Sequence, residues 1–374
     1  MVTSHLLSPL LALLVGTASA IPAPQEFPPP PLPGDGSWGL EKFTSLVAFG
    51  DSYTDESRLA YFIATGGQAP PVGWIGPEVR AIMIRNKKQK TGHSFFDQSN
   101  STSTGGRIWP RYVADYTGAN LYDYAVSGAV CSNKQVNRYL ASINGPFPDV
   151  EGYEIPAFLA DKAYAANGTS VLNIPDTETV YSMWIGTNDL GGNAFLTESQ
   201  APGLTIVDYI DCVYNQFDTL YENGARYFVL MNLAPLQLAP VYATPERGGV
   251  GQYLNATETS YRMKEQVNLA NNVYKYQTPY ELLIAKRYPD AHFAIFDMYS
   301  LLTDIYINPA EYLNGTAPLN VTSYINTGDS TLSLTDRDSY MWYDALHPSE
   351  QTDRVIAANF VEVVRGTSKW ATYW

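Results

Sequence analysis

The stretch Val47-Ala48-Phe49-Gly50-Asp51-Ser52 leads from an apolar run into a Gly-Asp-Ser tripeptide. Short, largely apolar runs are typical of strands that are buried on both faces of a parallel sheet. In such sheets ligands bind beyond the carboxyl ends of the strands, so we expect Ser52 to project into a crevice. A helix is expected to follow, and its N-terminal amide groups favour developing negative charge. Taken alone, the tripeptide also fits an ordinary turn, because all three residue types are common in turns.

Similar apolar runs recur along the chain and alternate with helical patterns. The runs that predict strands are Ser45–Phe49, Leu121–Val126, Thr179–Ile185, Tyr227–Leu233 and Phe293–Met298. The patterns that predict helices are Ile206–Asn223, Glu258–Arg287 and Glu350–Val364. This alternation indicates an α/β fold with a parallel sheet and crossover helices. The polar segment Trp74–Thr104 is expected to be an inserted surface loop.

The composition is that of a chain that can bury a full core. Of its 374 residues, 45% are hydrophobic and 16% are charged, and the formal net charge is -14. An acidic protein repels phosphate backbones and anionic lipid surfaces, so nucleic acid is not expected as a partner. The charge is more compatible with a soluble protein that acts on neutral substrates.

The N-terminal region has the features of an export signal. Residues 1–20 contain the apolar run Leu10–Val15, which is too short to span a bilayer, and end in the cleavage site Ala18-Ser19-Ala20. A retained membrane anchor is the alternative. Residues 21–38 are rich in proline and are predicted to be a leader, and residues 39–374 are predicted to form one domain. We therefore predict a secreted, extracellular protein without stable membrane anchorage.

Sequons and cysteines are compatible with export. The N-x-S/T sequons are at Asn100, Asn167, Asn255, Asn314 and Asn320. Those that are glycosylated would lie on the surface. Cys131 and Cys212 are the two cysteines of the chain, too few for a structural zinc site. In an exported protein we expect them to form a disulfide, and the alternative is two separate buried thiols.

A second pattern with chemical meaning lies near the C-terminus, at Asp344-Ala345-Leu346-His347-Pro348. A serine hydroxyl is a weak nucleophile until a base takes its proton, and histidine suits that task at neutral pH. The imidazole must be held in one tautomer, usually by a carboxylate. Asp344 can fold back toward His347 across a single turn. The remaining histidines, which lie in less suitable contexts, are His5, His93 and His292.

Two further patterns follow predicted strands. In Trp184-Ile185-Gly186-Thr187-Asn188-Asp189 the side-chain amide of Asn188 can donate a hydrogen bond to an oxyanion. In Tyr124-Ala125-Val126-Ser127-Gly128-Ala129 the backbone N–H of Gly128 can approach a substrate closely, because glycine has no Cβ. Each pattern alone also fits an ordinary turn or the start of a helix.

The four patterns, taken in order, resemble the sequence blocks of the SGNH (GDSL-type) hydrolase family. The resemblance covers nearly the whole chain after residue 38. It implies a flavodoxin-like, three-layer α/β/α fold with a central five-stranded parallel sheet. It also implies Ser52 as nucleophile, His347 as general base and acid, and Asp344 as its orienting partner. The oxyanion hole would be formed by the N–H groups of Ser52 and Gly128 and the side chain of Asn188. Such a serine hydrolase works through an acyl-enzyme and needs neither a metal nor an organic cofactor.

These patterns say more about the mechanism than about the substrate. The family often has leucine after Gly-Asp-Ser, and here Tyr53 stands in that place. Tyr53 is therefore a candidate for contact with the substrate. Trp109 and Trp342 are further candidates, because aromatic faces near a crevice could stack on sugar rings and Trp342 lies two residues before Asp344. The overall pattern is similar to secreted fungal carbohydrate acetylesterases of the carbohydrate esterase family 16 type, which predicts an oligosaccharide or other small ester as substrate. The alternatives are a secreted lipase or phospholipase and, from another class, a non-catalytic glycan-binding protein.

Overall fold

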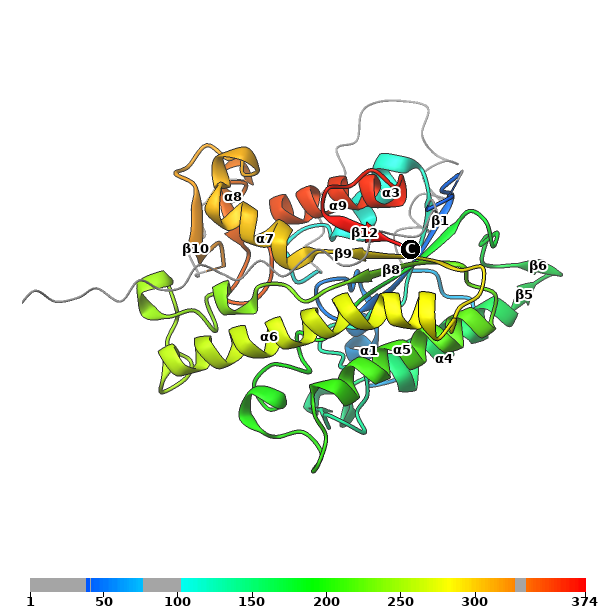
Figure 1. Cartoon of the computed structure of the whole chain (residues 1–374), viewed down its shortest axis with the longest axis horizontal. Coiled ribbons are helices and arrows are strands. Elements are labelled where there is room, and N and C mark those ends of the chain that lie inside the picture. The colour runs from blue at the N-terminus through cyan, green and yellow to red at the C-terminus, as the bar shows by residue number, and fades with distance from the viewer. Residues whose placement is uncertain (1–37, 41, 77–101, 327–333) are drawn as a thin grey trace, which may run out of the picture. The chain divides into compact units, whose positions relative to one another are not determined.

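The computed structural model describes residues 38–40, 42–76, 102–326 and 334–374 (Figure 1). The predicted signal peptide, nearly all of the predicted leader, the sequon at Asn100 and most of the loop predicted at Trp74–Thr104 lie outside these residues. The division into signal peptide, leader and catalytic domain stays a prediction.

The fold is built on a six-stranded sheet with the order β12-β9-β8-β7-β1-β2. Its parallel strands are β1 (Ser45–Gly50), β2 (Asn120–Asp123), β7 (Thr179–Trp184), β8 (Tyr227–Met231) and β9 (His292–Phe296). All five predicted strands are thereby confirmed, with ends that differ by a few residues. They form the predicted five-stranded parallel sheet, to which the structure adds one strand that was not predicted, β12 (Ala371–Tyr373), paired antiparallel with β9 at the edge.

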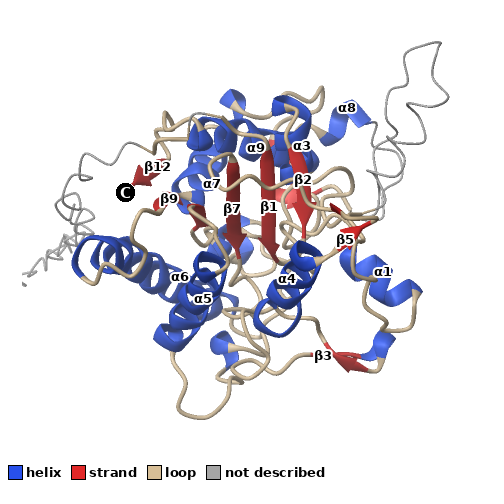
Figure 2. Cartoon of the chain, turned by 90° about the vertical axis from the view of Figure 1, so that its right-hand side faces the viewer, coloured by secondary structure: helices blue, strands red, loops and turns tan. Residues whose placement is uncertain are grey.

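The helices cover both faces of this sheet, as Figures 1 and 2 show. One face carries α4 (Ile155–Ala163), α5 (Ile206–Glu222) and α6 (Ala256–Pro279). The other carries α3 (Trp109–Thr117), α7 (Met298–Ile307) and α9 (Glu350–Val364). The three-layer α/β/α architecture is therefore confirmed. Every residue of β1, β7 and β8 is buried, which explains why these strands are largely apolar and do not alternate between apolar and polar residues.

The predicted helices are α5, α6 and α9. α5 begins at a capping box, in which Thr205 and Asp208 bond each other's backbone N–H groups. α6 begins at Asn255, whose side chain accepts a hydrogen bond from the N–H of Glu258, and continues into a π-helical turn at Tyr280–Ile284. Among the described helices none is both long and apolar enough to cross a bilayer.

Shorter strands and helices lie in the loops that connect the elements of the main sheet. The small strands form the pairs β3 (Tyr139–Leu140) with β4 (Gly145–Pro146), β5 (Ala165–Ala166) with β6 (Thr169–Ser170), and β10 (Asn320–Tyr324) with β11 (Tyr340–Trp342). Two short helices are α1 (Arg58–Ala64) and α8 (Leu334–Arg337). A disulfide between Cys131 and Cys212 joins the loop after β2 to α5.

Candidate active site

Ser52 lies in a tight turn at the carboxyl end of β1, as the strand pattern predicted. The turn starts at Gly50, which has φ +150°, and a Cβ there would lie 2.3 Å from the carbonyl oxygen of Trp184. The backbone then bends back, because the N–H groups of Thr54 and Asp55 both donate to the carbonyl of Asp51. Only 6% of Ser52 is exposed, so its hydroxyl stands in a nearly dry environment.

The structure brings His347 and Asp344 to this serine. The Nε2 atom of His347 lies 2.8 Å from Ser52 Oγ, and Nδ1 lies 2.9 and 2.8 Å from the two carboxylate oxygens of Asp344. Asp344 Oδ1 also accepts hydrogen bonds from the backbone N–H groups of Leu346 and His347. Burial alone would raise the pKa of Asp344, but these hydrogen bonds and the charge of His347 hold that pKa below its usual value.

The loop that carries His347 is fixed at both ends. On one side the N–H of Tyr343 donates to the carbonyl of His347, which closes the loop onto the end of β11. On the other side Ser349 caps α9 by accepting a hydrogen bond from the N–H of Thr352. The imidazole is thereby positioned by regular elements and not by the loop alone.

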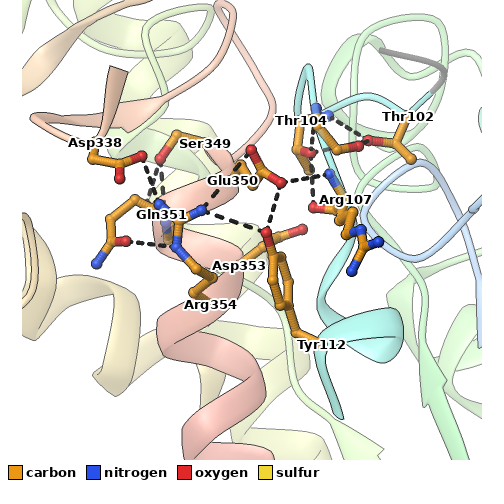
Figure 3. A network of polar contacts seen from close by, with 12 residues as sticks. Thr102, Thr104, Arg107, Tyr112, Asp338, Ser349, Glu350, Gln351, Asp353 and Arg354 are labelled. Carbon is orange, nitrogen blue, oxygen red and sulfur yellow. Dashed lines mark hydrogen bonds and ion pairs between the residues drawn. The ribbon is translucent and has the colours of Figure 1, made fainter. Parts of the chain in front are cut away.

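A polar network anchors the first turn of α9 to α3 and to the segment before it (Figure 3). Glu350 accepts hydrogen bonds from the N–H of Arg107 and from the hydroxyl of Tyr112. Asp353 accepts one from the N–H of Trp109, at the start of α3. Since α9 begins three residues after His347, this network holds the histidine loop in register with the sheet.

The predicted oxyanion-hole groups lie around the same serine. Among the described residues, none accepts a hydrogen bond from the N–H of Ser52 or of Gly128. Gly128 has φ +90°, and a Cβ there would lie 2.3 Å from the ring of Phe147, so both the backbone conformation and the available space favour glycine. The side-chain amide of Asn188 donates to the carbonyl of Ala129 at 2.9 Å and, at a long 3.4 Å, to Asp51. The second contact is weak enough to be exchanged for an oxyanion.

Two buried carboxyl groups, those of Asp51 and Asp189, lie in the loops around the proposed oxyanion hole. The sequence patterns assigned no role to either. Asp189 accepts a hydrogen bond from the N–H of Cys131 on one oxygen, and no described residue bonds the other. Burial raises the pKa of Asp189 to about 7 and that of Asp51 to about 6. Asp189 therefore ties the loop after β7 to the loop after β2. The Gly-x-Asn-Asp pattern contains this residue, but nothing in a linear pattern shows that it is buried.

The three aromatic residues predicted to contact substrate do not do so, and that prediction was wrong. Tyr53 is 1% exposed and Trp109 and Trp342 are 0% exposed, so none can offer a ring face to a ligand. Tyr53 packs its edge against His347 and donates a hydrogen bond to the carbonyl of Leu346. The indole N–H groups of Trp109 and Trp342 donate to Thr54 and to the carbonyl of Val321. All three rings therefore support the site from inside the core.

A cavity of about 480 Å³ opens beside His347 and Asn188. Its walls come from loops that are far apart in the sequence, which is why sequence patterns did not reveal them. The polar side chains that line it are Arg138, Thr187, Asn188, Asn193, Tyr242, Gln252, Tyr253, Tyr324 and Asn326. Within the described part of the chain, no group of His, Cys, Asp and Glu side chains is arranged to hold a metal ion.

A serine, a histidine and an aspartate in one hydrogen-bonded chain, at the carboxyl end of a parallel sheet, are typical of serine hydrolases that cleave acyl bonds. The family model for GDSL-like lipase/acylhydrolase matches residues 46–360. The chain therefore belongs to this family and is a hydrolase that acts on ester bonds.

Curated relatives agree with this assignment. A protein from Hypocrea jecorina named acetylesterase is 39% identical over 348 residues, which cover 89% of this chain and 92% of that protein. The GDSL esterase/lipase EXL5 from Arabidopsis thaliana is 24% identical over 350 residues, covering 87% of this chain and 92% of its own length. Among solved structures, LAE5, an alpha/beta hydrolase enzyme from the metagenome of Lake Arreo, Spain, is 13% identical with a TM-score of 0.40, covering 89% of this chain and 99% of that chain.

Proposed function

We propose that this protein is a secreted acetylesterase that removes acetyl groups from hemicellulose-derived carbohydrates by means of a Ser52–His347–Asp344 triad. The observation that carries the proposal is the unbroken hydrogen-bonded chain from Ser52 Oγ through His347 to Asp344 at the edge of a polar cavity. The name of the 39% identical relative supports acetyl as the acyl group of the ester.

In the proposed mechanism His347 Nε2 takes the proton of Ser52 as Oγ attacks the acetyl carbonyl. The resulting oxyanion accepts hydrogen bonds from the N–H groups of Ser52 and Gly128 and from the amide of Asn188. The bond between the acyl carbon and the sugar oxygen then breaks, and the imidazolium of His347 protonates that oxygen, so the sugar leaves as a free hydroxyl and an acetyl group stays on Ser52. His347 next takes a proton from water as the water attacks this ester, and it returns that proton to Ser52 Oγ when the bond between Oγ and the acyl carbon breaks and acetate is released.

Asp344 acts through the histidine in this scheme. Because the pKa of Asp344 lies below its usual value, its carboxylate stays ionised at the pH at which His347 works. It accepts a hydrogen bond from Nδ1–H, which keeps the proton on Nδ1 and leaves Nε2 free to act as the base, and it stabilises the imidazolium that forms.

The lining of the cavity supports a hydroxyl-rich alcohol as the other half of the ester. Amide groups of Asn193, Gln252 and Asn326 and phenol groups of Tyr253 and Tyr324 supply both donors and acceptors. Tyr253 and Tyr324 are also partly exposed, so their rings are available to stack on a sugar. A long-chain lipase would need a broad apolar entrance, whereas the larger apolar side chains of this lining are Val241 and Leu346.

The proposal includes export. Asn167, Asn255 and Asn314 are exposed and Asn320 is partly exposed, so these sequons are compatible with glycosylation. The disulfide between Cys131 and Cys212 is of the kind that persists in oxidising compartments.

The decisive experiment is a chain-length series on the purified parent and on Ser52→Ala. p-Nitrophenyl acetate, butyrate, octanoate and palmitate are assayed beside acetylated xylo-oligosaccharides. We expect turnover that depends on Ser52, is strongest on acetyl esters and releases acetate from the sugars. A preference for octanoate or longer chains would establish the lipase alternative. Equal rates in parent and Ser52→Ala would refute the triad, and absence of turnover with retained sugar binding would indicate a glycan-binding protein.

A further inference from the structure

Arg138 is a cavity residue that the mechanism above does not use. It stands just before β3 and lines the cavity together with Asn188 and His347. Its Nη1 atom donates a hydrogen bond to the carbonyl of Gly128 at 2.8 Å, and its guanidinium lies 4.8 Å from the centre of the Phe147 ring. The cation is therefore held in a defined place, next to the proposed oxyanion hole.

Arg138 has no carboxylate in direct contact among the described residues of the chain. Among the described residues it forms no ion pair, and its side chain makes no hydrogen bond besides the one to Gly128. The carboxyl groups that act on it electrostatically belong to Asp189 and Asp51. Both are fully buried, and burial raises their pKa values to about 6 and about 7. Both carboxyl groups are therefore mostly uncharged only below about pH 6. Burial also lowers the pKa of Arg138, but a guanidinium starts from so high a pKa that it stays protonated.

The remaining charged groups of the cavity wall are already engaged. Asp344 and His347 bond each other, so among the described residues of the cavity wall Arg138 is the charged side chain without a direct ion-pair partner. The chain as a whole carries a formal charge of -14, so it repels anions at a distance. A single half-buried cation inside the cavity can still attract an anion at short range, because solvent screens it less there than on the surface.

We propose that Arg138 binds a carboxylate on the alcohol part of the ester, so that acetylated acidic sugars, those containing a uronic acid, are the preferred substrate class. The proposal rests on the proposed function and makes it more specific. An acetyl group carries no charge, so the anion must belong to the alcohol. A guanidinium presents several N–H donors in a plane, an arrangement that suits a carboxylate better than a hydroxyl. The neutral substrate expected from the net charge alone is thereby replaced by an anionic one.

A purely structural role is the competing explanation. The bond from Arg138 to the Gly128 carbonyl also supports the loop that carries the proposed oxyanion donor. A loss of that support would slow every substrate by the same factor. A carboxylate-binding role, by contrast, would discriminate between substrates that differ only in that carboxylate.

The test uses the monoacetates of methyl β-D-glucuronide and methyl β-D-glucoside, acetylated at the same hydroxyl. kcat/KM is measured at constant low ionic strength for the parent, for Arg138→Gln and for Arg247→Gln, which removes an exposed arginine outside the cavity wall. We expect the parent to favour the uronide by roughly tenfold, mainly through KM, as a charge-assisted hydrogen bond provides. Arg138→Gln should abolish this preference, Arg247→Gln should keep it, and added salt should reduce it.

Three results would overturn the proposal. The parent could show no preference, Arg138→Gln could slow both acetates equally, or Arg247→Gln could remove the preference as well. If the parent cleaves p-nitrophenyl acetate but neither sugar acetate, the proposed function fails, and Arg138 is then tested separately. Methyl β-D-glucuronide should inhibit p-nitrophenyl acetate hydrolysis more than methyl β-D-glucoside in the parent but not in Arg138→Gln. Equal inhibition by the two sugars would overturn the carboxylate site.

Discussion

Gly128→Ala is the change that most directly probes how the proposed oxyanion hole is built. The added Cβ would lie 2.3 Å from the Phe147 ring, and φ at this position is +90°. A left-handed φ costs a residue with a side chain about 1–3 kcal/mol, and overpacking costs about 1–3 kcal/mol more. The free energy of unfolding should therefore fall by about 2–6 kcal/mol. Displacement of the Gly128 N–H should lower kcat by about 100- to 1,000-fold, as loss of one oxyanion donor does.

The assay combines urea unfolding with initial rates on p-nitrophenyl acetate. Gly118→Ala is the matched control, because Gly118 has φ +75° but a Cβ added there would have no atom within 4 Å. It should lose about 1–3 kcal/mol of stability without a change in kcat. In Gly128→Ala/Phe147→Ala the clash is removed while the strained φ remains, so kcat should recover by about tenfold or more. A kcat for Gly128→Ala close to that of the parent would refute the assignment of this N–H to the oxyanion hole.

The other predictions concern the histidine partner, a buried acid and the disulfide. Asp344→Asn should lower kcat by about 10⁴-fold with little change in stability, because the amide would favour the wrong tautomer of His347; steady-state kinetics with urea unfolding measure both. The pKa of Asp189 is raised to about 7 from an ordinary 3.8, so the folded state binds this proton more tightly than the unfolded state. The contribution of Asp189 to the free energy of unfolding should therefore decline as the pH rises from about 4 to about 7. In urea unfolding, Asp189→Asn should flatten this part of the dependence of stability on pH. Replacing Cys131 and Cys212 by serine should cost about 4–5 kcal/mol in unfolding free energy, as expected for a disulfide that closes a loop of 81 residues.

Each of these has an outcome that would contradict it. A fully active Asp344→Asn variant would show that the carboxylate does not orient the histidine. If the Asp189→Asn variant kept the full pH dependence of the parent, another group would have to hold the proton. Alkylation of both cysteines in the denatured, unreduced protein would show that no disulfide had formed.

The strands and helices that were predicted correctly are marked by local features of the sequence. β1, β7 and β8 are buried along their whole length, so each is a largely apolar run of strand length. The local pattern therefore agrees with the tertiary environment of these strands. α5 and α9 have caps that can be seen in the sequence, at Thr205 and Ser349. β12 was missed because it is a short, half-buried strand whose partner, β9, supplies the pairing.

The aromatic residues illustrate the limit of sequence proximity. Tyr53 follows the proposed nucleophile directly and Trp342 precedes Asp344 by two residues, yet both rings point into the core. Neighbouring residues on a strand or tight turn point in different directions, so nearness along the chain does not decide which side chain reaches the cavity. Tyr253 and Tyr324, which do line it, belong to segments without any recognisable pattern.

The sequence by itself determined the order of the elements, the α/β class and the residues proposed for the chemistry. These depend on local features: buried runs, caps, and short motifs placed where strands end. That Ser52 and His347, 295 residues apart, lie 2.8 Å from each other, and that Arg138 lines the cavity, follows from the tertiary structure alone. Such distances and the shape of a cavity result from how distant loops pack on the sheet, and no short stretch of sequence contains that information.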